Sequence, residues 1–472
     1  MAPGRTRIRR RRLAAAGGAA LLIVVLVVAL SGGGTPRAPA PGVASRARGG
    51  DPFAYVPAHA AAFASRATAG DGHVLFEKSP GGAVATARRV AAFRGVIDAA
   101  ASGTGIDPAT LEGIVYLESA GVPGAIAGGD PSGAAGLTQI EPATGAQLLG
   151  MKVDLNRSRA LTRAINVANG RAQIARLEAE RARVDERFDP RRALRATVRY
   201  LQLAQQRFGR HDLAIESYHM GIGNLSGVLD AYDGGAPVPY VQLYFDTAPD
   251  RHGSAYRILS SFGDDSWTYY WRVLAAEQIM KLYRSDPAAL KRLSSLQSGA
   301  GSAALVLHPP DRTPRLADPG AVASAYAAHQ LVRLPRDQSS LGLAYDPGIG
   351  SGASKLGVSP ALYYGLQPVA LQLLIELAAR VRSLSGGASP LIVSSAVADR
   401  QYQQALGVTD PPAADGWAFT IARHYASRAQ AGAFQAMLDR LQALNLIAWQ
   451  RYPGEIEVTV ASGAGRVIAA GL

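Results

Sequence analysis

Two long stretches rich in Gly, Ala, Pro and Ser interrupt the hydrophobic patterning of this chain, over residues 32–85 and 291–354. Sequences of this composition carry few periodic apolar residues and are typical of flexible linkers. A chain of 472 residues also exceeds the size of one ordinary hydrophobic core. The two stretches therefore predict two globular domains, over residues 86–290 and 355–472.

The two predicted domains differ in their patterning. Residues 86–290 show helical periodicity, and Asp107 and Asp189, each followed by Pro, are typical helix starts. The last block combines apolar helical segments with short alternating strands, of which the final one covers residues 455–460. The sequence therefore predicts a mainly α domain followed by a smaller α+β domain.

An apolar run from Leu13 to Leu30 follows directly after a cluster of arginines at the start of the chain. Its length is close to the ~20 residues that cross a bilayer as a helix. The positive charge predicts that residues 1–12 stay in the cytoplasm, so residues 13–31 are expected to be a single-pass anchor in the cell membrane with both domains on the extracytoplasmic side. A cleaved signal peptide, processed within residues 35–45, is the alternative and would give a secreted protein.

The net charge of +13 is concentrated near the N-terminus. Six of these charges come from Arg5, Arg7, Arg9, Arg10, Arg11 and Arg12. The remaining +7 shows no basic stripe interleaved with aromatic residues, so we expect no nucleic-acid partner. The chain has no cysteine, which excludes a disulfide framework, a thiolate metal site and a thiol nucleophile.

Residues 159–187 form a segment rich in Ala and Arg, with an approximate helical period and opposite charges within one turn of each other. This pattern predicts a solvated helix inserted in the mainly α domain. A coiled-coil partner site is the less favoured interpretation.

The segment Leu111-Glu-Gly-Ile-Val-Tyr-Leu-Glu-Ser119 places Glu118 at the end of an apolar predicted helix. An apolar environment raises the pKa of a carboxyl group, and a protonated glutamic acid can donate a proton to a glycosidic oxygen. Glu112 lies on the same segment, so a helical glutamate by itself identifies no site.

Two further motifs follow in order along the chain, Gly136-Leu-Thr-Gln-Ile140 and Ser217-Tyr-His-Met-Gly-Ile-Gly-Asn224. Together with Glu118-Ser119 they resemble the catalytic domain of soluble lytic transglycosylases, a relative of goose-type lysozyme. The resemblance implies a lysozyme-like helical fold that acts on peptidoglycan glycan strands without a metal or cofactor.

The resemblance also implies roles for single residues. Glu118 would be the catalytic acid and then base, and the substrate-binding residues would be Ser119, Gly136, Gln139, Tyr218, Gly221 and Tyr269. Gln139 is equally typical of a helix cap or a core amide, and Tyr218 of a half-buried core tyrosine.

In the reaction that the resemblance implies, the bond between N-acetylmuramic acid and N-acetylglucosamine breaks and a 1,6-anhydro-muramyl end forms. The family uses one carboxylate, and the substrate's acetamido group takes the place of the second one. Two departures affect the last motif, because His219 replaces the family's Asn and Met220 replaces a small residue. A hydrolytic muramidase on the same fold and a non-catalytic wall-binding scaffold therefore stay open as alternatives.

The C-terminal block weakly resembles the zinc D-Ala-D-Ala carboxypeptidase fold, through Leu391–Arg400, Gly416–Thr420 and the final strand. Ala413 and Thr420 occupy positions where that family needs metal ligands. The resemblance implies a degenerate peptidase-like module without zinc, and an unrelated α+β interaction domain is the alternative.

Overall fold

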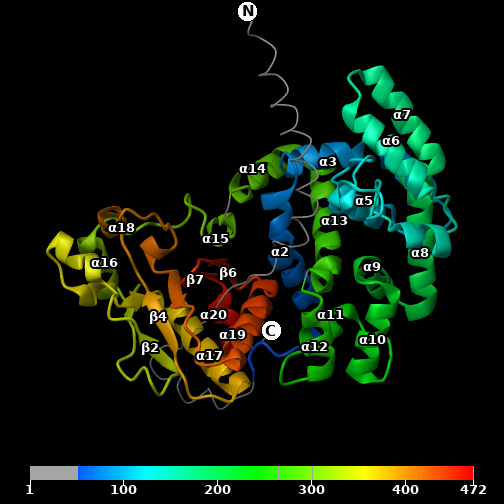
Figure 1. The fold of residues 1–472 in the computed structure, drawn as a ribbon. Coiled ribbons are helices and arrows are strands. Elements are labelled where there is room, and N and C mark those ends of the chain that lie inside the picture. Colours follow the sequence, from blue (N-terminus) through cyan, green and yellow to red (C-terminus); the bar gives the residue numbers. More distant parts are fainter. Residues whose placement is uncertain (1–50, 264, 300, 471–472) are drawn as a thin grey trace, which may run out of the picture. The chain divides into compact units, whose positions relative to one another are not determined.

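The computed structural model describes residues 51–263, 265–299 and 301–470, which form two compact units (Figure 1). Each unit is assembled from separate segments of the chain. The first comprises Val74–Tyr240 and Leu259–Ser295, and the second comprises 51–73, Val241–Ile258 and 296–470. Four helices contain a boundary between these segments: α2 (Ala60–Lys78), α11 (Tyr240–Asp246), α12 (Gly253–Ser261) and α14 (Pro287–Gln297).

The described secondary-structure elements of the first unit are helices, joined by loops that contain a few isolated β-bridges. Its long helices are α3 (Ala83–Ala91), α4 (Arg94–Ala101), α5 (Pro108–Ser119), α6 (Leu155–Val167), α7 (Arg171–Val184), α8 (Pro190–Phe208), α9 (His211–Met220), α10 (Ile222–Asp233) and α13 (Tyr269–Ser285). Shorter helical turns are η3 (Ala127–Gly129), η4 (Thr144–Leu148), η5 (Glu186–Phe188) and η6 (Ser266–Thr268).

Helices α5 and α13 pack antiparallel in the core of the first unit. Thr110 Oγ1, near the start of α5, donates to Glu277 Oε1 in the second half of α13 at 2.9 Å. A Cβ atom at Gly113 would lie 3.0 Å from both Cγ1 and the carbonyl oxygen of Val273, so the missing side chain permits this close approach. The arrangement brings Tyr269, the first residue of α13, to the last turn of α5.

The second unit combines helices with a five-stranded sheet in the order β2-β4-β5-β7-β6. β2 runs parallel to β4, and the other neighbours are antiparallel. The strands are β2 (Leu343–Tyr345), β4 (Leu391–Ser395), β5 (Ala418–Ala422), β6 (Ile447–Arg451) and β7 (Glu455–Val460), and a separate pair joins β1 (Val332–Arg333) to β3 (Gly365–Leu366).

The helices of the second unit are α15 (Ser302–Leu307), α16 (Pro319–Ala327), α17 (Pro368–Ser385), α18 (Arg400–Leu406), α19 (Arg428–Ala443) and α20 (Ala464–Ala470). Shorter turns are η2 (Pro57–His59), η7 (Ser351–Leu356), η8 (Pro360–Tyr363) and η9 (Ala413–Asp415). The predicted combination of a mostly helical fold with a small sheet region is thus confirmed, but the unit that contains the sheet is not the smaller of the two.

Both predicted linkers are wrong for most of their described residues. The 32–85 stretch contains the nineteen-residue helix α2, because its many alanines favour helix and the Phe63 side chain is fully buried against the Phe245 ring at 4.8 Å. The 291–354 stretch contains α15, α16 and β2, and β2 adds an edge strand to the sheet beside β4. Its Gly and Pro residues separate short elements and do not mark a free tether.

The charged segment over 159–187 is also more than one solvated helix. The chain breaks at Ala168–Gly170 into a hairpin of α6 and α7. Arg181 and Arg187 are buried despite their charge, because each guanidinium finds acceptors inside the unit. Periodicity predicted helical structure here, but neither the break between the two helices nor the buried arginines.

The predicted cytoplasmic segment over 1–12 and the membrane helix over 13–31 lie outside the described residues. Within the part of the chain that the structure does describe, every helix is too short or too polar to cross a membrane.

Candidate active site

Helix α5 has defined ends that fix the position of Glu118. The Asp107 side chain accepts a hydrogen bond from the Ala109 amide, and Pro108 occupies the first turn, where its missing N–H costs nothing. The helix ends at Ala120, whose φ of 52° is in the left-handed region. Glu118 therefore lies in the last turn, one residue before the end of the helix.

The Glu118 carboxyl is half-buried and accepts a hydrogen bond from the Tyr269 hydroxyl, with 2.7 Å between Oε1 and the phenolic oxygen. Burial raises the pKa of Glu118 to about 7, and the hydrogen bond from Tyr269 opposes this shift. A carboxyl group with this pKa can hold a proton near neutral pH and release it again, as general acid and base catalysis requires.

Glu112, the other glutamate of this helix, has a different environment. Its carboxylate is buried and forms ion pairs with Arg94 Nη1 at 3.0 Å and with Arg284 Nη1 at 2.7 Å. Two guanidinium partners hold Glu112 as a structural anion within the helix packing. The structure thus separates two glutamates that the sequence places six residues apart on one helix.

Aromatic rings surround the Glu118 carboxyl. Tyr218 and Tyr269 stack with 6.4 Å between ring centroids and 20° between planes. Burial and the nearby negative charge of Glu118 raise the pKa of both hydroxyls above 10. Both tyrosines therefore stay protonated at physiological pH and can act only as neutral hydrogen-bonding groups.

His219 lies beside these rings, at the position where it departs from the motif. Its ring stacks on Tyr269 with 5.2 Å between centroids and 11° between planes. Its Nε2 is 3.9 Å from Asp265 Oδ1, and Asp265 also forms an ion pair with Arg272. His219 thus supplies a flat ring against Tyr269, which an asparagine would not do.

The segment Gly136–Ile140 is held against α5 and α9 by hydrogen bonds. Ser119 Oγ donates to the Leu137 carbonyl at 2.7 Å, and the Tyr218 hydroxyl donates to the Thr138 carbonyl at 2.8 Å. Ser119 is buried. Ser119 and Tyr218 therefore position this segment around Glu118.

Gln139 Nε2 donates to the carbonyls of Ala125 and Gly136, at 3.1 and 2.9 Å. Its Oε1 is buried and has no hydrogen-bond partner among the described residues. The amide thus braces its own loop, as a core amide would, and keeps one acceptor free for a further donor.

Gly136 has a φ of 86°, and a Cβ atom there would lie 1.7 Å from the Arg187 carbonyl oxygen. Only glycine fits such a close backbone crossing. Gly221 has a φ of 90° between α9 and α10. The backbone conformation at these two positions therefore explains both glycines. No described contact of either glycine points to a bound substrate.

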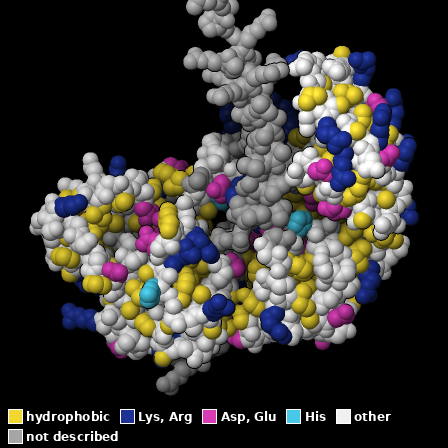
Figure 2. Space-filling view, in the orientation of Figure 1, with side chains coloured by type: hydrophobic (Ala, Val, Ile, Leu, Met, Phe, Trp, Pro, Cys, Tyr) yellow, Lys and Arg dark blue, Asp and Glu magenta, His cyan; other side chains and the backbone are white. Residues whose placement is uncertain are grey.

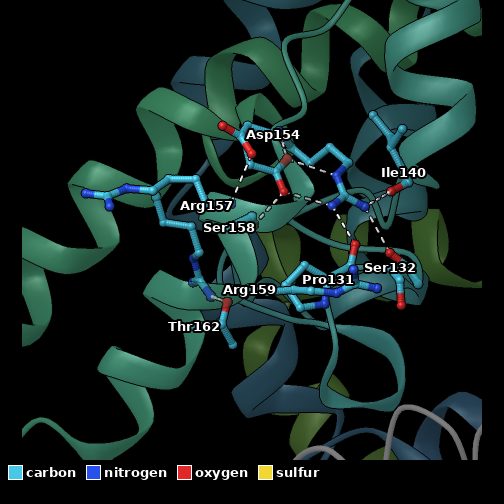
Figure 3. Close-up of polar contacts among 12 residues, drawn as sticks. Pro131, Ser132, Ile140, Asp154, Arg157, Ser158, Arg159 and Thr162 are labelled. Carbon is cyan, nitrogen blue, oxygen red and sulfur yellow. Dashed lines mark hydrogen bonds and ion pairs between the residues drawn. The ribbon is translucent and has the colours of Figure 1, made fainter.

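A buried ion pair also holds the segment that contains Gly136, here called the Gly136 loop (residues 131–140). The sequence did not predict this ion pair. The Arg187 guanidinium bonds to both carboxylate oxygens of Asp185, at 2.9 and 2.8 Å, and both side chains are fully buried. It also donates to the carbonyls of Pro131, Gly133 and Ile140. Figure 3 shows Pro131 and Ile140 close to one guanidinium group. Arg187 thus ties residues on both sides of Gly136 to η5.

Comparison with known families agrees with this geometry. Residues 95–182 match the family model described as the transglycosylase SLT domain. This part of the chain is similar to that family. The sequence-based resemblance to lytic transglycosylases is thereby confirmed for this region, and a search of curated proteins found no match.

The match to the SLT domain covers Glu118 and the Gly136–Ile140 loop but ends within α7. Tyr218, Gly221 and Tyr269 lie beyond it. The structure brings Tyr218 and Tyr269 to Glu118, of which only Tyr218 was expected there, and the roles of both toward a substrate stay predictions. Sequence reasoning missed Asp265 and Asp185, because neither lies in a recognised motif: Asp265 pairs with His219 of α9, and Asp185 pairs with Arg187 two residues along the chain.

The raised pKa of Glu118 predicts how the stability of the SLT domain depends on pH. A folded-state value of about 7 against an ordinary 4.5 contributes stability below pH 4.5, which is lost as pH rises through 7. Glu118→Gln removes this loss. We expect the stability of the variant relative to the parent to increase by on the order of 2–3 kcal/mol between pH 4 and pH 8, measured by urea unfolding. An unchanged difference across this range would place the pKa of Glu118 near its ordinary value.

Tyr269→Phe is expected to keep the ring stack with Tyr218 and His219 and to remove the hydrogen bond to Glu118. Hydrogen bonds to charged groups contribute about 1.5–3 kcal/mol, so kcat of any reaction that uses Glu118 as acid or base should fall about 10- to 100-fold. The hydrogen bond from Tyr269 lowers the pKa of Glu118, so its loss should also move the alkaline limb of the pH–rate profile to higher pH. Tyr270→Phe is the neighbouring control and should leave that limb unmoved.

Proposed function

We propose that this chain is a peptidoglycan lytic transglycosylase, with Glu118 as the catalytic acid and base. The observation that carries the proposal is the Glu118 carboxyl, which has a pKa raised to about 7 and lies beside Tyr269 within a transglycosylase SLT domain. The substrate is the β-1,4 bond between N-acetylmuramic acid and N-acetylglucosamine in glycan strands.

In the proposed first step, protonated Glu118 donates its proton to the glycosidic oxygen as the bond to C1 of the muramyl residue breaks. The acetamido group of the same sugar assists at C1, so no second carboxylate is required. In the second step, the Glu118 carboxylate takes the proton of the C6 hydroxyl, and the C6 oxygen bonds to C1 as the bond between C1 and the acetamido oxygen breaks. Glu118 is protonated again at the end, and no water is consumed.

The tyrosines and the Gly136 loop are proposed to serve this carboxyl. The Tyr269 hydroxyl stabilises the carboxylate form that exists between the two steps, because it donates to Oε1. Tyr218, Ser119 and Gly136 fix the loop backbone, and the free Oε1 of Gln139 is the acceptor proposed to face a sugar hydroxyl. The protein needs no metal or cofactor for these steps.

The location proposed for this activity is the extracytoplasmic side of the cell membrane, where peptidoglycan lies. It depends on the apolar run from Leu13 to Leu30 and the arginines that precede it. If that run is cleaved, the enzyme is secreted to the same compartment.

The products of peptidoglycan digestion test the proposed reaction. The full chain is incubated with purified peptidoglycan, and the soluble muropeptides are weighed by mass spectrometry. A transglycosylase releases anhydro ends, which are one water lighter than the reducing ends that a muramidase releases. Sedimentation with the wall without any release would instead support the scaffold that His219 and Met220 kept open, and would contradict the proposal.

A further inference from the structure

The positive charge of the folded chain is concentrated in one short region. Residues 155–199, from the start of α6 into α8, contain twelve arginines and five carboxylates, a surplus of seven positive charges. This equals the +7 that remains after the six N-terminal arginines are removed from the net charge of +13. Positive and negative charges therefore balance over the rest of the sequence, and the surplus lies within the first unit.

Most of these arginines are available at the surface. Arg181 and Arg187 are buried, and Arg157, Arg159 and Arg192 form ion pairs with carboxylates. The other seven are exposed and form no ion pair with a described residue: Arg163, Arg171, Arg176, Arg183, Arg191, Arg195 and Arg199. Figure 2 shows Lys and Arg side chains following the edge of the molecule that α7 and α8 form.

Three of the seven form a row along α8. Arg191, Arg195 and Arg199 are spaced four residues apart, so they lie on one face of the helix, about 6 Å apart along its axis. Arg199 Nη1 donates a hydrogen bond to the Leu149 carbonyl at 3.4 Å. The guanidinium groups of Arg191 and Arg195 form no hydrogen bond with a described residue. Like charges at this spacing repel each other, so the row lowers helix stability unless an anion compensates.

We propose that the α8 row and the adjoining arginines of α7 bind a linear polymer with repeated phosphate groups. Each guanidinium presents a planar fork of donors that fits two phosphate oxygens at once. A row of evenly spaced guanidinium groups is better suited to binding a polymer with repeated negative charges than to binding one small anion. The expectation that this polymer lies in the cell envelope rests on the proposed function. The expectation that the arginines bind the polymer does not.

Two other polyanionic partners fit this surface less well. The only aromatic residue within 155–199 is Phe188, which is buried beneath Arg181, so no exposed ring in this region can stack on the bases of a single-stranded nucleic acid. Val167 is the only large apolar side chain within 155–199 that is strongly exposed, at 74%. A membrane-surface helix would need an apolar face to insert below the headgroups.

Binding of inorganic polyphosphate to the full chain tests this inference. The row is removed with Arg191→Gln, Arg195→Gln and Arg199→Gln together. A matched control removes three exposed arginines elsewhere with Arg88→Gln, Arg292→Gln and Arg312→Gln, so both variants lose the same charge. Affinity is measured by isothermal titration calorimetry between 50 and 300 mM salt.

We expect the row variant to bind polyphosphate about 10- to 100-fold more weakly, with the slope of log K against log salt reduced by about 2. The control variant should change affinity less than about threefold. Equal losses in the two variants would mean attraction by net charge alone and would overturn the inference, as would binding to anionic lipid vesicles without binding to polyphosphate.

A second readout separates this inference from the proposed function. Peptidoglycan stripped of attached polymers is digested by the parent and by the row variant, and both should release muropeptides at the same rate. A slower row variant would show that the row contacts the glycan substrate, which contradicts the polymer inference. A parent that releases nothing would end the proposed function and leave the polyphosphate result standing by itself.

Discussion

Glu118→Gln should lower kcat/KM for peptidoglycan cleavage by about 10²- to 10⁴-fold. Glutamine keeps the shape of the side chain and can still accept the hydrogen bond from Tyr269, but it has no proton to give and cannot take one up. Because the proposed reaction uses this carboxyl twice, we expect the loss to lie at the upper end of that range. The measurement is the initial rate of muropeptide release, at equal concentrations of folded parent and variant.

The control is Glu141→Gln, which changes an exposed glutamate near the Gly136 loop in the same way. It should change the rate less than about twofold, as expected for a surface substitution. A Glu118→Gln protein with more than a tenth of the parent rate would mean that another group supplies the proton.

Arg187→Met is expected to destabilise the first unit by about 3–5 kcal/mol, the usual cost of leaving one partner of a buried ion pair uncompensated. The substitution leaves the Asp185 carboxylate fully buried without its guanidinium. It also leaves the carbonyls of Pro131, Gly133 and Ile140 without their shared donor. Because these carbonyls border the Gly136 loop, the folded variant should also cleave glycan more slowly.

Arg192→Met is the matched control for that prediction. Arg192 pairs with Glu186 and lies close to Asp189, but its side chain is 52% exposed. Exposed ion pairs contribute about 0–1 kcal/mol, so the control should unfold at almost the same urea concentration as the parent. A loss below about 1 kcal/mol for Arg187→Met would show that the buried network does not hold the loop.

The sequence predicted the helices of the first unit well where the local signals are strong. Asp107-Pro108 and Asp189-Pro190 begin helices in the structure as they do in the sequence, because capping and proline geometry depend only on neighbouring residues. The final strand over 455–460 likewise has the predicted bounds, since its alternation matches a strand with one buried face.

The two stretches were wrongly predicted to be linkers, because the composition of a segment does not show which distant residues pack against it. Helix α2 and strand β2 form in Gly- and Ala-rich stretches where distant residues supply the packing. In the same way, nothing local distinguishes Arg187 from the exposed arginines around it. Its burial depends on Asp185 and on carbonyls more than forty residues away.

The candidate site was predictable in its members but not in its contacts. Glu118 and Tyr218 were expected together from motif order, and the structure places both next to Tyr269, whose position beside Glu118 was not predicted. That the donor to Glu118 is Tyr269, and that Glu112 is neutralised by Arg94 and Arg284, follows from helix packing between α5 and α13.

The protonation state of Glu118 near neutral pH is the most direct test of this account. It can be measured by NMR titration of glutamate side chains labelled with ¹³C at the carboxyl carbon, with the Glu118→Gln protein identifying the signal. The account predicts one carboxyl signal that titrates near pH 7 in the parent and is absent from the variant. A Glu118 signal that titrates below pH 5 would contradict it, because the carboxyl would then have no proton to donate at neutral pH.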